Sequence, residues 1–150
     1  MKPGGRLAIV LPQGRFNNSS DAHIRHFIAE HARILAVVGL HGNTFKPHTG
    51  TKTSVLFLQK WNEDASDLRY HCPKVDDYPI FFAVSDEGGK DNSGQYIFAR
   101  DEAGRRRIDR YGHFILHHDL HNHGDDLQDG IAEAFIQFAH EQGFGFVGAK

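Results

Sequence analysis

Residues 1–14 read MKPGGRLAIVLPQG and contain the stretch that decides the fold. A Gly-Gly turn leads directly into a continuous apolar run, Leu7, Ala8, Ile9, Val10 and Leu11. Runs of this kind are typical of strands that are buried on both faces of a parallel sheet. Such a strand needs neighbours along its edges. The sequence therefore predicts a sheet built around residues 6–12.

Residues 13–60 alternate between helical and extended patterns. The polar loop 13–20 supplies Asn and Ser oxygens suited to helix capping, and apolar residues then recur at helical spacing from Ile24 to His31. Strands are expected at 34–38 and 53–59, separated by a polar loop over 39–52. The helix is long enough for a right-handed parallel crossover, and the last two strands suit an antiparallel hairpin.

The chain changes character near Trp61, where an Asp-rich segment begins, so we place a domain boundary between 1–60 and 61–150. Short strands are expected at 80–84 and 95–100. A final helix is expected from a cap at Asp126, through Leu127, to a stop at Gly143, with its apolar stripe on the sheet. The Gly-Gly-Lys of residues 88–90 lacks the spacing of a phosphate-binding loop and is interpreted as an ordinary loop.

Charge and composition bound the function. Residues 1–60 carry eight Lys and Arg against two acidic residues, whereas 61–150 carry nine against seventeen. A positive first part is compatible with an anionic partner such as nucleic acid, although scattered surface lysines give the same count. The single cysteine, Cys72, excludes an internal disulfide. Because no apolar run resembles a signal peptide or a membrane span, we expect a cytoplasmic protein without a membrane partner.

Several segments together resemble one family. KPGGRLAIVLPQG, HIRHFIAEHA, ILAVVGL and FKPHTGTKTSVLFLQKW are similar to the second half of the catalytic domain of adenine-N6 DNA methyltransferases. The likeness is strongest to the modification subunit of type I restriction-modification systems. It continues through YPIFFAVSDEGGKDNSGQYIF and IAEAFIQFAHEQGF, which resemble the stretch that follows the methyltransferase core in that group.

The resemblance implies a Rossmann-like α/β sheet that binds S-adenosylmethionine and methylates a flipped-out adenine in DNA. The family's Phe-x-Gly-x-Gly cofactor loop and its Asn-Pro-Pro-Tyr motif are both absent from the sequence. We therefore expect the distal half of such a sheet, with parallel strands plus an antiparallel hairpin in 1–60 and an α+β extension over 61–150. Alone, this chain is expected to be inactive and to bind no cofactor. The implied partners are DNA, the specificity and restriction subunits and, in a split enzyme, a separate N-terminal half.

The resemblance also implies residues of a DNA-facing cleft. Phe45 stands where the family commonly presents an aromatic ring to the flipped base, and the alternative is a phenylalanine that anchors a long loop on the core. Contacts to DNA phosphates are expected from Arg15, Lys46, His48, Thr51, Lys52 and Thr53, although a solvated loop explains them about as well. Pro12, Gln13 and Asn17 are expected to shape the mouth of the cleft, with helix capping as the alternative for Asn17.

A histidine-rich segment, HFILHHDLHNHGDD at residues 113–126, offers a different site. Its candidate metal ligands are His117, His118, His121 and His123, because neutral imidazole suits zinc and nickel. The resembled family needs no metal, so none is expected. The nearby Arg105, Arg106, Arg107 and Arg110 are interpreted as a solvated strand edge.

Three functions remain open from the sequence. The first is a piece of an adenine-specific DNA methyltransferase. The second is a non-enzymatic module that docks on a chain supplying the cofactor half, and the third is a small metal-binding domain built on the histidines. The first two predict an exposed apolar edge beside residues 7–11, whereas the third predicts a closed fold with a stoichiometric metal.

Overall fold

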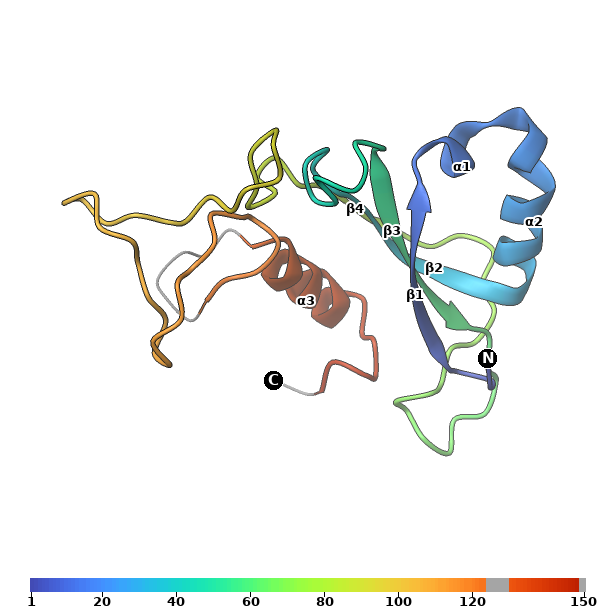
Figure 1. Cartoon of the computed structure of the whole chain (residues 1–150). Helices are drawn as coiled ribbons and strands as arrows, with labels where there is room; N and C mark the ends of the chain where they lie inside the picture. Colours follow the sequence, from blue (N-terminus) through green and yellow to red (C-terminus); the bar gives the residue numbers. More distant parts are fainter. Residues whose placement is uncertain (124–129, 149–150) are drawn as a thin grey trace.

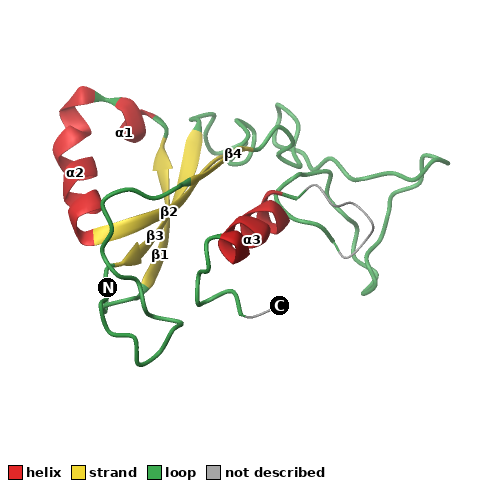
Figure 2. Ribbon diagram, turned by 180° about the vertical axis from the view of Figure 1, so that it is seen from behind, coloured by secondary structure: helices red, strands yellow, loops and turns green. Residues whose placement is uncertain are grey.

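A computed structural model describes residues 1–123 and 130–148. Its strands form one mixed sheet in the order β1-β3-β2-β4, with helices on both faces (Figures 1 and 2). The strands are β1 (Arg6–Pro12), β2 (Ala32–Gly39), β3 (Thr53–Lys60) and β4 (Phe81–Val84). The helices are α1 (Gly14–Asn17), the 3-10 turn η1 (Ser19–Asp21), α2 (Ala22–His31) and α3 (Ile131–Glu141).

The three strands of residues 1–60 have the predicted connections. β3 is antiparallel to both β1 and β2, so β1 and β2 are parallel to each other with β3 between them. Helix α2 connects β1 to β2, which confirms the parallel crossover, and β2 and β3 form the predicted long-looped hairpin. The registers pair Leu7 with Leu58 and Val37 with Leu56.

Strand β1 differs from its prediction in burial. Among the described strands it pairs only with β3, at the sheet edge, and Leu7, Ile9 and Val10 are 39%, 39% and 46% exposed. The prediction of burial on both faces is wrong. An apolar run shows that a strand is suited to apolar contacts, but β1 is an edge strand with no described neighbour on its outer side. The exposed apolar edge expected beside residues 7–11 is present.

The first face of the sheet packs against α1 and α2. Its core is formed by Ala32, Leu56 and Leu58, with Phe16 and Ile28 partly buried against them. Alternate residues of β3 thus point to this face, because successive side chains of a strand lie on opposite sides. At the start of β1, Gly4 has φ +69° and its N–H donates to the Lys60 carbonyl at 3.1 Å, which fixes the Gly-Gly turn against the end of β3.

The second face packs against α3 and the segment after it. Leu35, Ala139 and Phe144 form this core. The rings of Phe81 and Phe135 meet edge to face with centroids 5.5 Å apart, so the predicted stripe of α3 does lie on the sheet. The predicted cap Asp126 and the stripe residue Leu127 fall outside the described residues. Within the described ranges, no helix combines the length and apolarity needed to cross a membrane.

Strand β4 extends the same sheet from the second part of the chain. It pairs with β2 in parallel, from Ala36 opposite Phe81 to Gly39 opposite Val84. Between β3 and β4, Cys72 is 3% exposed, and burial raises the pKa of its thiol. A buried thiol with a raised pKa is a poor nucleophile at neutral pH, so Cys72 is a packing residue.

The entry into α2 is organised by an ion pair instead of a cap. Asp21, the residue before α2, makes no side-chain capping hydrogen bond to this helix. The buried carboxylate of Asp21 accepts hydrogen bonds from the Arg15 guanidinium at 3.1 and 3.2 Å. Arg25 donates to the Asn18 carbonyl at 2.8 Å. The capping interpretation of residues 17–20 is therefore wrong, because Asn17 ends α1 and Ser19 and Ser20 lie in η1, ahead of α2.

Residues 89–118, called the arm below, replace the predicted strand at 95–100. Isolated bridges stand there instead, and the chain projects from the sheet beside α3 (Figure 1). Three hydrogen bonds close a ring within the arm: Ala99 N–H donates to Ile115, Ile115 to Arg107, and Arg107 back to Ala99, at 2.9 to 3.0 Å. Asp-x-x-Gly turns join its segments, and backbone donors hold the pKa values of Asp101 and Asp109 below the usual range.

Candidate functional site

The carboxyl ends of the parallel strands meet at one end of the sheet. β1 ends at Pro12, β2 at Gly39 and β4 at Val84, and the antiparallel β3 begins there at Thr53. The loops 13–21, 40–52 and 85–96 all leave from this end (Figure 1). Because open α/β sheets bind ligands in the crevice outside the carboxyl ends of their strands, this end is the candidate site.

The predicted cleft-mouth and phosphate residues meet where two of these loops begin and end. Pro12 lies opposite Thr53 in the strand register. The Gln13 N–H donates to the Lys52 carbonyl at 3.0 Å. The two loops, although far apart in the sequence, are thus held together at their bases.

Arg15 and Asn17 lie on the short helix α1. The Arg15 side chain is 59% exposed, but its guanidinium is paired with Asp21. A phosphate contact by Arg15 would therefore have to share the guanidinium with this carboxylate. Asn17 is exposed at the last position of α1.

Loop 40–52 presents the predicted aromatic ring. Phe45 is 37% exposed and, among the described residues, belongs to neither core cluster. His48 and Thr51 are also exposed, and Thr51 accepts a hydrogen bond from the Thr49 hydroxyl at 3.0 Å. Phe45 is thus a partly exposed ring in a loop at the carboxyl end of the parallel strands.

Lys90 holds this loop in place, and the sequence did not reveal it. Its ammonium donates to the backbone carbonyls of Thr44 and Lys46, both at 3.0 Å. The Asn43 amide in turn donates to the Lys90 carbonyl at 3.2 Å. Gly94, at φ +89°, lies against the Lys46–Pro47 peptide, where a Cβ would come within 2.6 Å of the Pro47 nitrogen. A lysine after two glycines predicts only a turn, and its carbonyl partners come from a loop more than forty residues upstream.

We expect Lys90→Met to loosen loop 40–52. Methionine keeps the apolar stem but removes the donors, which leaves the Thr44 and Lys46 carbonyls without this partner and costs about 1–2 kcal/mol of stability. Chemical denaturation and limited proteolysis within 41–49 would measure the change. Lys74→Met, at an exposed lysine, is the control and should change stability by less than about 0.5 kcal/mol. Equal behaviour of the two variants would contradict the role of Lys90.

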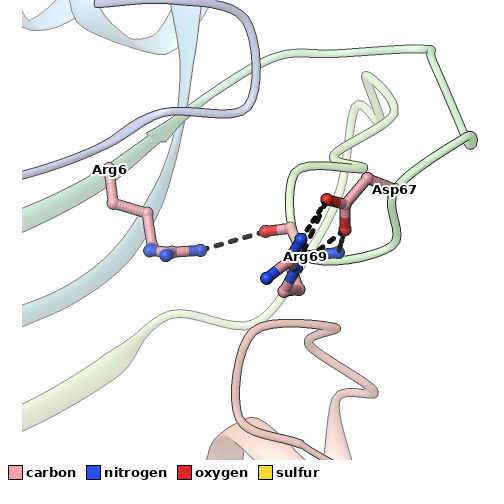
Figure 3. Close-up of polar contacts among 3 residues, drawn as sticks. All are labelled: Arg6, Asp67 and Arg69. Carbon is pink, nitrogen blue, oxygen red and sulfur yellow. Dashed lines mark hydrogen bonds and ion pairs between the residues drawn. The ribbon is translucent and has the colours of Figure 1, made fainter.

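A cavity of about 760 Å³ lies away from the candidate site. It is bordered by the first residues of the chain and by the loop 62–70. Figure 3 shows part of its frame, where Arg6 donates to the Arg69 carbonyl at 3.0 Å and the Arg69 guanidinium pairs with Asp67 at 2.7 Å. Since it adjoins the start of β1 and not its carboxyl end, it is not the predicted cleft.

The histidine-rich segment forms a second cluster. One ring nitrogen from each of His118, His121 and His123 lies within 4.8 Å of the others. His117, another of the candidate ligands, is not part of this trio and pairs with Glu87 at 3.0 Å. Burial, reinforced by His121 and His123, lowers the pKa of His118. The segment's Asp125 and Asp126 lie outside the described residues.

The arginines of the arm stay away from the candidate site. Arg105 pairs with Asp101 at 2.8 Å. Arg106 stacks over the rings of Phe98 and Phe114, with its guanidinium carbon 4.5 and 5.4 Å from their centroids. Arg106 is exposed, as the interpretation of a solvated strand edge expects, but isolated bridges replace the strand, and its guanidinium also contacts aromatic rings.

Comparison with known proteins shows the class to which these features belong. Residues 1–128 match the profile of the N-6 DNA methylase family, and the chain belongs to this family. The predicted family and its Rossmann-like α/β fold are thereby confirmed, in agreement with the parallel β1–α2–β2 crossover and the mixed sheet.

Among individual proteins, the chain is similar to the type I restriction enzyme EcoEI methylase subunit of Escherichia coli. The two are 37% identical over 73 residues, which cover 48% of this chain and 15% of that protein. A class I S-adenosylmethionine-dependent methyltransferase from Listeria monocytogenes shares 28% identity over 55% of this chain and 22% of its own, with a TM-score of 0.42. A chain in a solved structure of a type I restriction-modification system shares 27% identity over 39% of this chain and 12% of its own, with a TM-score of 0.37.

Proposed function

We propose that this chain supplies the distal half of the catalytic domain of a type I restriction-modification adenine-N6 methyltransferase. With its other half, the domain transfers a methyl group from S-adenosylmethionine to adenine in DNA. The observation that carries the proposal is the coincidence of two features on one sheet. Loops with an exposed aromatic ring and basic residues gather at the carboxyl ends of the parallel strands, and the outer edge of β1 is apolar and unpaired among the described strands.

The edge of β1 is the surface on which the other half would dock. An apolar strand edge left open in water favours unwanted pairing, and natural sheets usually cover or charge such edges. Leu7, Ile9 and Val10 are apolar and exposed beside this edge. A further strand paired with β1 would continue the sheet and bury these side chains.

The residues at the candidate site do not fit the cofactor by themselves. The Phe-x-Gly-x-Gly loop is absent from the sequence, the backbone N–H of Gln13 donates to the Lys52 carbonyl, and the Asp21 carboxylate accepts from Arg15. Cofactor binding therefore falls to the other half, and no step of the transfer is derived from this chain.

This chain's part is to hold the base and the DNA. Phe45 stacks on the flipped adenine, whose extrusion costs a few kcal/mol of unstacking. The phosphate contacts fix the position of the DNA without reading its sequence, and they come from Arg15, Lys46, His48, Thr51, Lys52 and Thr53. Pro12, Gln13 and Asn17 shape the mouth of the cleft. The specificity and restriction subunits and DNA are the proposed partners in the cytoplasm.

Reconstitution tests the proposal. We expect the chain alone to show no micromolar binding of S-adenosylmethionine in calorimetry. Mixed with a chain that carries the Phe-x-Gly-x-Gly and Asn-Pro-Pro-Tyr motifs, it should form a complex that methylates adenine. Val10→Lys places a charge on the exposed β1 and should weaken this association at least about tenfold, since a buried charge is costly.

Val84→Lys is the matched control, because Val84 is 71% exposed on β4, the strand at the opposite edge of the sheet from β1. It should associate like the unmodified chain. Micromolar cofactor binding by the chain alone, or equal effects of the two lysine variants, would refute the proposed division of labour. A complex that forms through β1 yet never methylates DNA would favour the non-enzymatic docking module.

A further inference from the structure

Three histidine rings face one another at the junction of the arm and α3. The ring centroids of His118, His121 and His123 are 4.7, 4.8 and 4.7 Å apart. The Nε2 atoms of His118 and His123 are 3.0 Å apart. Two ligand nitrogens on a tetrahedral zinc ion, each at 2.0–2.1 Å, lie about 3.3 Å from each other. The nitrogens of His118 and His123 are thus close to the spacing that one metal ion requires, and the three ligand nitrogens, all within 4.8 Å of one another, would draw closer together on binding it.

The hydrogen bonds of the imidazole rings determine which ring nitrogens are unprotonated and available to bind a metal ion. Nδ1 of His121 contacts the Asn122 carbonyl at 3.1 Å, an interaction that places the proton on Nδ1 and leaves Nε2 free to ligate. Nδ1 of His118 accepts from the Leu120 N–H at 3.3 Å, which is long for a hydrogen bond. If His118 binds the metal through Nε2, its ring proton must lie on Nδ1. The hydrogen bond from the Leu120 N–H to Nδ1 is then lost.

The segment that carries the rings is held on both sides. The Asp119 carboxylate accepts hydrogen bonds from the Ser85 hydroxyl at 2.6 Å and from the Asp86 N–H at 2.7 Å, just after β4. On the other side, the Asn122 N–H donates to the Glu133 carboxylate at 3.1 Å, and the Ile131 N–H donates to the Asp119 carbonyl at 2.9 Å. The rings are therefore placed by a fixed backbone, which lowers the entropy that a ligand must overcome.

We propose that His118, His121 and His123 bind one borderline divalent transition-metal ion, with Zn²⁺ as the best-suited ion, and that this ion fixes the segment 118–123 between the arm and α3. Imidazole ligands favour Zn²⁺, Ni²⁺ and Cu²⁺ over Mg²⁺ and Ca²⁺, which prefer oxygen. The cluster borders a cavity of about 390 Å³ whose lining includes Asp86 and Glu87. Water in this cavity can complete a four-coordinate site, and the two carboxylates favour a cation there. The site adds to the proposed function and does not rest on it.

Calorimetric titration of the untagged, chelator-treated chain with ZnCl₂ tests the site. We expect one Zn²⁺ per chain with micromolar or tighter affinity, and no heat with MgCl₂. Saturating Zn²⁺ should also raise the melting temperature by about 5 °C or more, because a ligand that binds only the folded chain stabilises it.

A pair of double variants separates this site from the other histidines. His121→Ala with His123→Ala should weaken Zn²⁺ binding at least about tenfold and abolish the melting shift. His113→Ala with His117→Ala removes as many histidines from the same segment, but these side chains pair with Asp109 and Glu87, so both readouts should persist. Circular dichroism checks that each variant is folded. Absent stoichiometric binding, or equal losses in the two double variants, would overturn the proposal.

Discussion

In the reconstituted enzyme, Phe45→Ala is expected to lower the rate of adenine methylation by about 10- to 100-fold. Stacking of a base on an aromatic side chain contributes about 1–3 kcal/mol, and alanine removes it. Phe45 is exposed at the carboxyl end of the sheet, so its loss leaves no hole in either core cluster. Single-turnover transfer of a labelled methyl group to a DNA duplex measures the rate directly.

Two further variants test whether a loss of methylation rate in Phe45→Ala comes from the missing aromatic ring at this position. Phe45→Tyr keeps the ring and should stay within about threefold of the unmodified rate, because tyrosine also stacks. Phe82→Ala removes an exposed phenylalanine from β4, where the side chain is 70% exposed, and should change little. If Phe45→Ala methylates at the full rate, the stacking role is wrong and the ring serves only the loop.

Leu58→Ala is expected to lower the free energy of unfolding by about 3 kcal/mol. Leu58 lies on the strand between β1 and β2, is 4% exposed, and packs with Ala32 and Leu56 under α2. Alanine leaves a cavity that the surrounding strands cannot close without shifting their registers. Urea denaturation followed by far-ultraviolet circular dichroism gives the value.

Leu68→Ala provides the comparison for this substitution. Leu68 is 65% exposed, so its truncation should cost less than about 0.5 kcal/mol. Similar losses in the two variants would mean that β3 is not the centre of the packed sheet.

Local patterns were sufficient to find the four strands that the structure describes, but they also predicted a strand at 95–100 that is absent. The apolar runs predicted β1 and β2, and the hairpin of β2 and β3 followed from a long polar loop between two such runs. The exposure of β1 could not be predicted in the same way, because burial depends on neighbours outside the run. The predicted strand at 95–100 is absent for a related reason, since the arm closes a ring of hydrogen bonds among three segments.

Part of the candidate site could also be predicted from the sequence. The residue types of loops 13–21 and 40–52 pointed to one end of the sheet, and the pairing of Pro12 with Thr53 joins these loops there. The role of Lys90 could not be predicted from the sequence, because its partners are backbone carbonyls, which every residue carries. No metal was expected from the sequence, and spacing did not separate His117 from the other three candidate ligands, because the positions of the rings depend on the contacts of segment 117–123 in the folded chain.

The position of β3 affects how the chain folds during synthesis. β1 precedes its partner β3 along the chain, and β3 is synthesised only after α2, β2 and the long loop. Until β3 is synthesised, β1 lacks the strand with which it pairs in the described structure. Folding of this region is therefore governed by contacts that are distant in sequence, and these form more slowly than local ones. During this interval β1 is open to premature association, and chaperones or a pre-existing partner chain would protect it.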